Sequence, residues 1–290
     1  MIVFRRVLTL LFVILVLCLV STTSAQTIIP PKPTHIIVMS LDGARPDAIL
    51  QSETPNIQAL AARGAVSWEA QTVYPSVTTP AHVSMLTGLD VREHGVIWNA
   101  ALPGFQLTIP TFLSRAQEAG YRVAIVAGKT RFDQLFDGEF ALSTVGDRGV
   151  VDLALDYLHS GYEVLFIHFP NPDYFGHLTG WMSETYLFEL RNTDSQVGRV
   201  LDAVEALDLT DETLIILTAD HGGHDKTHGS ALPEDMRIPW MVAGPGVLPG
   251  QTLEIDVHTS ATAATVLWTL GLTAPESTVA RPVFEAFVSR

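Results

Sequence analysis

The sequence has one cysteine in 290 residues, Cys18, which lies in an apolar N-terminal stretch that is expected to be removed. The rest of the chain therefore has no thiol group. Without cysteine, the protein forms no disulfide and holds no metal through thiolate ligands. It can work in an oxidising compartment, and any metal ion must be bound by carboxylates, imidazoles or other oxygen and nitrogen groups.

Basic residues are also scarce. The chain has 17 Lys and Arg against 31 Asp and Glu, and its formal net charge is -14. Nucleic-acid binding needs clustered Lys and Arg to neutralise phosphate groups, so the composition disfavours a nucleic-acid scaffold as partner. Bound divalent cations would offset part of the acidic excess. Hydrophobic residues make up 47% of the chain, enough for the core of one large or two small domains.

The sequence offers no apolar run of the ~20 residues that a membrane-spanning helix usually needs. An apolar run at residues 7–20 is too short, follows Arg5 and Arg6, and precedes the small residues 23–25. This pattern predicts that residues 1–25 are a cleavable secretory signal peptide, with an uncleaved anchor as the alternative. We expect a secreted or periplasmic protein with no stable membrane span after cleavage.

A short linker at residues 26–33, with three prolines, leads into one predicted domain at residues 34–290. Apolar runs typical of buried strands alternate with helical segments. The strands are expected at residues 36–41, 123–126, 164–169, 214–217 and 240–242, and the helices at 54–63, 80–86, 110–119, 150–158, 182–207 and 260–270. Runs without in-out alternation are buried on both faces. The sequence therefore predicts an α/β fold, a three-layer α/β/α sandwich with a mostly parallel central sheet.

Aspartates and histidines gather where three of these strand runs end. In such sheets, sites form outside the carboxyl ends of the strands. The residues are Asp42, Asp173, His177, Asp220, His221 and, slightly further along, His228. Each pair alone is better explained by a solvated aspartate beside a structural histidine. Together they indicate a two-metal hydrolytic site, because such sites need several carboxylates and imidazoles in one place.

A candidate nucleophile lies at Thr78. We expect Pro80 at the first helical position, which would put Thr78 and Thr79 at the helix cap. Free backbone N–H groups and the helix dipole there favour an alkoxide and a bound phosphate. A metal ion on the threonine oxygen would lower its pKa and activate it. Taken by itself, the segment is better explained by an ordinary threonine cap.

Taken in order, the motifs resemble the alkaline phosphatase superfamily, above all its type I phosphodiesterase / nucleotide pyrophosphatase branch. The resemblance covers residues 35 to 250, approximately. The matching motifs are Leu41-Asp42-Gly43, Pro75-Ser76-Val77-Thr78-Thr79-Pro80-Ala81-His82, Thr87-Gly88, His94-Gly95-Val96-Ile97-Trp98-Asn99, Pro172-Asp173-Tyr174-Phe175-Gly176-His177, Ala219-Asp220-His221-Gly222, His228-Gly229 and Pro239-Trp240-Met241-Val242-Ala243-Gly244-Pro245-Gly246.

The resemblance implies an alkaline phosphatase-like fold and two divalent metal ions, with zinc expected and manganese also compatible with the ligands. It implies that Thr78 attacks phosphorus to form a phosphothreonine intermediate, which water then hydrolyses, and that Asn99 donates to a phosphoryl oxygen. One ion would be held by Asp42, Thr78, Asp220 and His221, and the other by Asp173, His177 and His228. His258, before the last helix, is the alternative third ligand of the second ion.

Two departures from the family weaken the case for a nucleotide substrate. Thr79 stands where the family has an aromatic residue that stacks on the base, and Ala81 stands where it has an asparagine. The resemblance therefore implies a zinc-dependent hydrolase of small phosphoric esters, of phosphodiesterase or nucleotide pyrophosphatase type. Alternatives are a phosphonate hydrolase, an envelope phospho-group transferase and a non-enzymatic metal-binding envelope protein. A sulfatase is disfavoured because its Cys/Ser-x-Pro-x-Arg motif is missing around Thr78.

Other polar residues receive structural predictions. Lys129 is expected to be a surface lysine, with contact to a substrate anion as the alternative. His82, His94 and His168 are expected to be structural and hydrogen bonded. His224 is expected near the ligands without binding a metal. The sequence leaves the oligomeric state and the natural substrate open.

Overall fold

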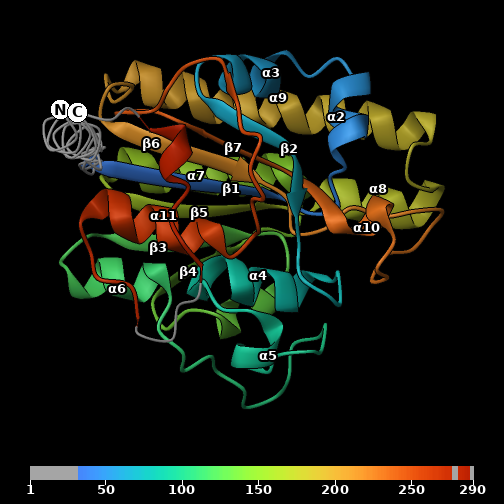
Figure 1. Ribbon diagram of the computed structural model, residues 1–290, viewed down its shortest axis with the longest axis horizontal. Coiled ribbons are helices and arrows are strands. Elements are labelled where there is room, and N and C mark those ends of the chain that lie inside the picture. Colours follow the sequence, from blue (N-terminus) through green and yellow to red (C-terminus); the bar gives the residue numbers. More distant parts are fainter. Residues whose placement is uncertain (1–31, 276–279, 288–290) are drawn as a thin grey trace, which may run out of the picture. The chain divides into compact units, whose positions relative to one another are not determined.

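A twisted sheet of eight strands forms the centre of the fold, in the order β4-β3-β5-β1-β6-β7-β2-β8 (Figure 1). The structure is a computed structural model that describes residues 32–275 and 280–287. The predicted signal peptide lies outside the described residues. The strands are β1 (His35–Leu41), β2 (Ala65–Gln71), β3 (Val123–Ala127), β4 (Glu139–Leu142), β5 (Val164–Phe169), β6 (Thr213–Thr218), β7 (Arg237–Ala243) and β8 (Gln251–Thr252).

The middle strands run parallel and are buried on both faces. Strand β1 lies between β5 and β6, with Ile36 opposite Val164 on one side and Leu214 on the other. All six residues of β5 and of β6 are buried. Each fully buried large aliphatic side chain contributes roughly 1.5–3 kcal/mol. Near-continuous Val, Ile and Leu runs therefore form these strands, as the sequence predicts.

One side of the sheet is covered by a layer built around the long helix α9, which contacts α2, α3, α7 and α8. The other side is covered by α4, α6 and α11 (Figure 1). The helices are α2 (Pro46–Gln51), α3 (Pro55–Ala62), α4 (Thr78–Thr87), α5 (Val91–His94), α6 (Phe112–Glu118), α7 (Gly146–His159), α8 (Asn171–Thr179), α9 (Glu184–Ala206), α10 (Pro233–Met236) and α11 (Ala261–Leu270), with 3-10 turns at Thr130–Gln134 and Phe284–Ala286. The predicted three-layer arrangement is confirmed in the described residues.

Several local predictions need correction. Strand β7 is antiparallel to both neighbours, β6 and β2, so the sheet is mixed toward one edge. Helix α4 begins at Thr78 with Val77 as its extended N-cap, two residues earlier than expected. Pro80 is therefore the third helical residue; the first turn tolerates proline because its N–H groups have no partner within the helix. Strands β2, β4 and β8 and the short helices α2, α5, α8 and α10 were not expected.

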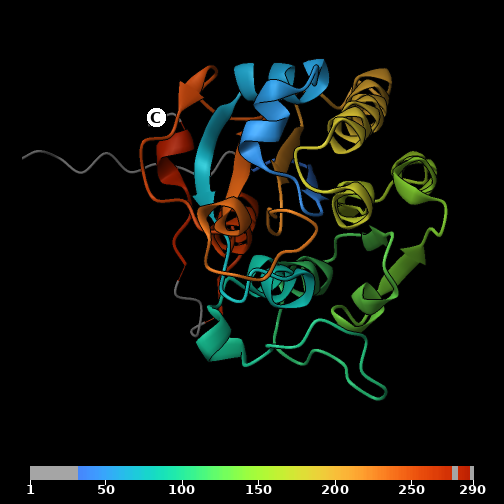
Figure 2. The same ribbon diagram turned by 90° about the vertical axis from the view of Figure 1, so that its right-hand side faces the viewer.

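The carboxyl ends of β1, β3, β5 and β6 meet at one edge of the sheet because these strands are parallel. Helices α8 and α10 lie at this edge, on the right-hand side of Figure 1, and Figure 2 looks at it directly. No helix in the described part of the chain is long and apolar enough to cross a membrane.

Candidate active site

Asp42 directly follows strand β1, and Asp220 and His221 come two and three residues after its neighbour β6; all three are fully buried. The Asp220 carboxylate accepts from the backbone N–H groups of Gly43 and His221, both at 3.0 Å. Gly43 has a positive φ of 69°, and a Cβ on it would lie 3.0 Å from Cα of Asp173. The turn after β1 therefore needs glycine, which lets Asp42 lie close to the start of α8.

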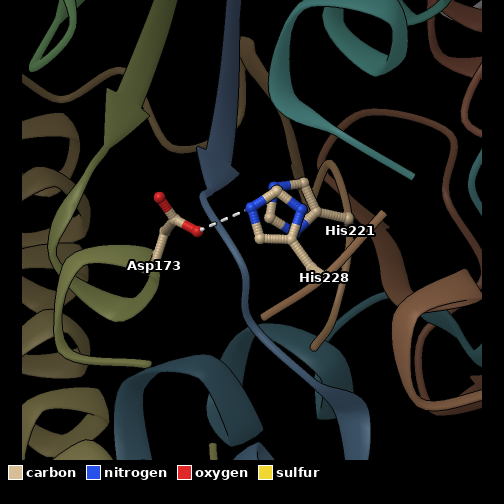
Figure 3. A group of neighbouring side chains, drawn as sticks. All are labelled: Asp173, His221 and His228. Carbon is tan, nitrogen blue, oxygen red and sulfur yellow. Dashed lines mark ion pairs between the residues drawn. The ribbon is translucent and has the colours of Figure 1, made fainter. Parts of the chain in front are cut away.

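Helix α8 follows β5 and presents Asp173 and His177, four residues apart, on one face. Oδ1 of Asp173 lies 3.4 Å from Nε2 of His177 and 3.5 Å from Nε2 of His228. Figure 3 shows the Asp173 carboxylate directed toward the rings of His221 and His228. These two rings stack, with centroids 3.8 Å apart. Residues from β6, α8 and the loop before α10 thus reach one point.

Two overlapping groups of side chains can each hold a cation: Asp42 with Asp220 and His221, and Asp173 with His221 and His228. In each group the ligand atoms lie within 4.8 Å of one another. Of the buried side-chain atoms that have no hydrogen-bond partner within residues 32–275 and 280–287, four lie at this site: Asp42 Oδ1, Asp173 Oδ1, Asp220 Oδ2 and His221 Nε2. Unpartnered buried polar atoms are costly, so their convergence fits metal binding.

The histidines are oriented for this role by their second ring nitrogen. Nδ1 of His221, His228 and His177 lies 2.8 to 3.0 Å from the carbonyl oxygens of Gly222, Ser76 and Lys226, respectively. A carbonyl can only accept, so Nδ1 carries the proton in all three rings. Nε2 of the neutral ring is then free as a metal ligand, in the arrangement usual for metal-binding histidines.

The loop between β6 and α10 carries His228 and is fastened to segments on both sides of the site. Nδ1 of His228 donates to the carbonyl oxygen of Ser76, just before α4. The carbonyl oxygen of Lys226 in the same loop accepts from Nδ1 of His177 in α8. The backbone N–H of Trp181, just after α8, donates to Asp225 at 2.7 Å. We call residues 221–232 the ligand loop. It joins the segment before Thr78 to the helix that carries Asp173.

The charges of the site also favour bound cations. Burial and the neighbouring charge of Asp42 raise the pKa of Asp220 to about 7. Burial would raise the pKa of Asp42 as well, but Lys129 and His168 hold it well below its ordinary value. Burial and the nearby His221 lower the pKa of His228 to about 4, so this ring is neutral and able to bind a metal. A divalent cation would allow all the carboxylates to ionise together.

Lys129 is not the surface lysine that we expected. It lies just past β3, and its Nζ is 2.5 Å from Oδ2 of Asp42 and 2.7 Å from Oδ2 of Asp173. The same Nζ lies 3.4 Å from Oγ1 of Thr78. Lysine thus occupies one oxygen of each carboxylate and leaves Oδ1 of each unpartnered. One sequence signal could have identified Lys129 as a site residue: it follows β3, whose carboxyl end lies at the same sheet edge as those of β1, β5 and β6.

Thr78 is buried at the first position of α4, beside Lys129. Asn99 approaches the same helix end: its Oδ1 accepts from the backbone N–H of Thr79 at 3.0 Å and also from Arg131. Since donors surround Oδ1, the Nδ2 group of Asn99 is left to donate to a ligand. Thr78, Asn99 and the two candidate cation positions therefore share one site.

A buried layer of polar groups lies behind the carboxylates. His168 contacts Asp42 Oδ2 at 2.7 Å through Nε2, and His82 bonds Ser40 at 2.9 Å and the Thr78 carbonyl at 2.8 Å. His224 pairs with Asp235 at 2.7 Å. Their hydrogen bonding agrees with the predicted structural roles, and His168 additionally orients a candidate ligand.

His258 lies elsewhere. It is exposed, forms an isolated bridge with Gln71, and lines a separate cavity of about 460 Å³ with Tyr74 and Asp90. It belongs to neither candidate metal group in the described part of the chain. The geometry thus favours His228 over His258.

Comparison with known proteins gives a consistent result. The model of a family described as type I phosphodiesterase / nucleotide pyrophosphatase matches residues 36–106 and 103–230. The chain is 24% identical over 241 residues to ectonucleotide pyrophosphatase/phosphodiesterase family member 7 of Mus musculus, covering 72% of this chain and 55% of that protein. It is 25% identical over 297 residues to the catalytic subunit of GPI ethanolamine phosphate transferase 2 of Homo sapiens, covering 93% and 30%.

Among solved structures, an inactive variant of murine ectonucleotide pyrophosphatase/phosphodiesterase 5 in complex with AMP superposes with a TM-score of 0.74 at 16% identity. The match covers 87% of this chain and 98% of that one. It confirms the predicted alkaline phosphatase-like fold. The chain spans about half the length of the first curated relatives that it matches.

Proposed function

The chain belongs to the type I phosphodiesterase / nucleotide pyrophosphatase family, and we propose on this basis that it is a metal-dependent phosphoric-ester hydrolase of phosphodiesterase type. One observation carries the proposal for this chain itself. Unpartnered buried atoms of Asp42, Asp173, Asp220 and His221 converge beside Thr78, at the N-terminus of a ten-residue helix. This combination supplies metal ligands, a hydroxyl nucleophile and an anion-binding helix end together.

We assign two divalent cations to the site, zinc being the ion that suits mixed carboxylate and imidazole ligands best. Asp42, Thr78, Asp220 and His221 would hold one. Asp173 and His228 would hold the other, and His221 belongs to both groups. His177 belongs to neither group, but its Nε2 lies 3.4 Å from Oδ1 of Asp173, and we assign it to the second ion on that contact. When bound, such ions supply charge that activates the attacking oxygen and stabilises the leaving oxygen.

In the proposed reaction on a phosphodiester, Oγ1 of Thr78 attacks phosphorus and the bond to the leaving oxygen breaks on the opposite side. The proton that Thr78 loses is balanced by the proton that the leaving alcohol takes up. The phosphorylated threonine still carries the second ester group, and water then releases it as a phosphomonoester and restores the threonine hydroxyl. Lys129, 3.4 Å from that oxygen, stabilises the attacking alkoxide and a phosphoryl oxygen. The free Nδ2 group of Asn99 donates to another phosphoryl oxygen. Arg131 and the Thr79 N–H hold Asn99 in the orientation that this requires.

The substrates we propose are small-molecule phosphoric esters. The names of the relatives include nucleotide pyrophosphatases, and the murine structure contains AMP. Here, however, the residue after Thr78 is Thr79, which offers no ring for a base to stack on. We also propose the extracytoplasmic location and the cleavable signal at residues 1–25, on the sequence pattern described above.

The test compares four matched p-nitrophenyl substrates, a phosphodiester, a phosphomonoester, a phosphonate and a sulfate, with zinc-loaded protein and with chelator-treated protein. A phosphodiester preference that disappears with the chelator and returns with zinc is the expected result. A preference for the phosphonate or the monoester would assign the same site to another branch of the superfamily. Absence of turnover on all four, despite bound zinc, would contradict the hydrolase proposal and favour the non-enzymatic metal-binding alternative.

Phospho-group transfer remains a second candidate, because a transferase subunit matches 93% of this chain. Transfer and hydrolysis differ only in the molecule that receives the phosphoryl group from Thr78. Adding increasing concentrations of an alcohol to the phosphodiester reaction separates them. Formation of a new phosphodiester with the added alcohol, at the expense of the phosphomonoester product, would favour transfer, whereas an unchanged yield of the phosphomonoester would favour hydrolysis.

A further inference from the structure

Helix α8 presents two neighbouring stripes of side chains at the site. Asp173 and His177 form the first, four residues apart. Tyr174 and Leu178 form the second, also four residues apart, and the residues of each pair stack one turn above each other. The second pair is apolar yet 61% and 53% exposed. The pair gives the surface beside the candidate metal ligands an exposed aromatic ring and an exposed aliphatic group.

A cavity of about 500 Å³ opens along this face of α8. Tyr174, Leu178 and Pro170 supply its apolar lining, and Asp173, His177 and Lys129 border it on the side of the site. We call it the α8 trough. Gly128 also lines the trough. A side chain at this position would clash with Pro170, since a Cβ would lie 2.2 Å from its ring. The trough has room for an aromatic ring or a comparable apolar group.

The proposed reaction determines which part of the substrate would reach the trough. Attacking and leaving oxygens lie roughly in line through phosphorus, so the leaving group points away from Thr78. Thr78 is assigned above to the first cation, so the second cation would be the one that stabilises the leaving oxygen. Two of its proposed ligands, Asp173 and His177, border the trough. The trough is thus the continuation of the leaving-group position, whereas the cavity at His258 includes none of the proposed catalytic residues.

We propose that the α8 trough is a binding site for the leaving group, and that the enzyme prefers phosphoric esters whose leaving alcohol carries an apolar or aromatic body. The inference rests on the proposed function and specifies its substrate class. Tyr174 offers a ring face for stacking, and Leu178 offers aliphatic contact. The carboxylate that borders the trough is already engaged, because Oδ2 of Asp173 contacts Lys129 and its Oδ1 is a candidate metal ligand, so a leaving group with a cationic head group finds no free counter-charge there.

The test uses methyl phosphodiesters whose leaving phenols have matched acidity but carry either an apolar or a quaternary ammonium substituent. We expect wild-type kcat/KM to favour the apolar phenol by about tenfold, equivalent to ~1.4 kcal/mol. Tyr174→Ala combined with Leu178→Ala should bring this ratio close to one, mostly through KM. Leu178→Glu should reverse it toward the cationic phenol. Because both residues are exposed, these variants are expected to fold.

Tyr74→Ala is the matched control, since Tyr74 is 63% exposed and lines the other cavity. It should leave the ratio unchanged. An unchanged ratio in the double variant, or an equal fall with Tyr74→Ala, would overturn the inference. Calorimetric binding of the free apolar phenol to zinc-loaded protein gives a readout without turnover: the double variant should bind it at least fivefold more weakly, and equal binding would also overturn the inference. Failure to turn over any ester would instead contradict the proposed function.

Discussion

The ammonium group of Lys129 lies 2.7 Å from Oδ2 of Asp173, while the other oxygen of that carboxylate faces His228 at 3.5 Å. One carboxylate is thus shared between a fixed cation of the chain and a candidate metal position. The same division holds for Asp42, whose Oδ2 contacts Lys129 and whose Oδ1 is unpartnered. Lysine and metal ions can therefore be present together, and Lys129 is part of the charged centre.

Replacing Lys129 should separate catalysis from metal binding. Lys129→Met keeps most of the apolar stem but removes the charge near Thr78, and we expect kcat to fall by about 100-fold. Metal content, measured by atomic emission, should stay at the wild-type level, because Oδ1 of each carboxylate remains available. Loss of a metal ion in this variant would show instead that Lys129 mainly maintains the ligand geometry.

Thr78→Ala should abolish phosphoryl transfer, with a fall in kcat of at least about 1000-fold, because no other hydroxyl occupies the start of α4 with the same contacts. Most metal binding should remain, since the carboxylates and imidazoles are intact. Mass spectrometry of wild-type enzyme that is acid-quenched during turnover of a phosphodiester should find a phosphoryl group on Thr78 that still carries the second ester group. Thr78→Ser is the control and should keep part of the activity; full activity in Thr78→Ala would exclude Thr78 as nucleophile.

His228→Ala should weaken one metal site by more than the roughly 10- to 100-fold typical of losing an outer-shell partner. Zinc titration against a competing chelator measures this. His258→Ala provides the comparison, because His258 lies in the separate cavity and outside both candidate groups. Loss of zinc with His258→Ala and wild-type stoichiometry with His228→Ala would reverse the ligand assignment.

Removing metal should lower thermal stability as well as activity. A ligand that binds only the folded state stabilises it by about 2.7 kcal/mol at 100 times its Kd. In the apo protein, buried Asp42, Asp173 and Asp220 also repel one another, with Lys129 as the nearby compensating cation. Calorimetry with and without dipicolinate should therefore show a lower Tm that zinc restores. Equal Tm values would argue against a metal site at these residues.

Asp147 gives a pH prediction away from the metal ligands. It is buried, accepts from Thr193 at 2.5 Å and from the backbone of Asn171 at 3.0 Å, and burial raises its pKa to about 7. Between its ordinary value of 3.8 and 7 the folded state binds more protons than the unfolded state, so stability falls as pH rises. The slope should approach ~1.4 kcal/mol per pH unit, and Asp147→Asn should remove this contribution. Urea unfolding at several pH values tests the difference.

The sequence predicts best those strands whose formation depends mainly on one effect, the burial of apolar side chains. The continuous apolar runs of β1, β5 and β6 are buried on both faces, and no other element type explains them as well. Strand β2 was missed because it mixes Ser67, Trp68 and Glu69 with apolar residues and carries a register irregularity. The antiparallel direction of β7 depends on how the ligand loop crosses the sheet edge, which no local pattern records.

The sequence predicted those site residues that are typical metal ligands and that follow a strand run. It did not predict a site residue whose long side chain reaches the site from another segment. Asp42, Asp173, Asp220, His221 and His228 lie together as expected. Lys129 was misjudged because isolated lysines are mostly exposed. Its burial comes from two carboxylates contributed by segments far away in sequence, Asp42 and Asp173. Such long-range compensation of charge is visible only once the strands are placed side by side.

The ligand loop has a consequence for redesign. Through His228 it is bonded to the segment before α4, and through Lys226 and Asp225 to α8 and the residue after it. Replacing only the ligand loop with the corresponding loop of a relative would disrupt these hydrogen bonds to the segment before α4 and to α8 at the same time. Altered specificity should therefore be transplanted as three segments together, so that the ligand loop, the entry to α4 and α8 behave as one exchangeable module.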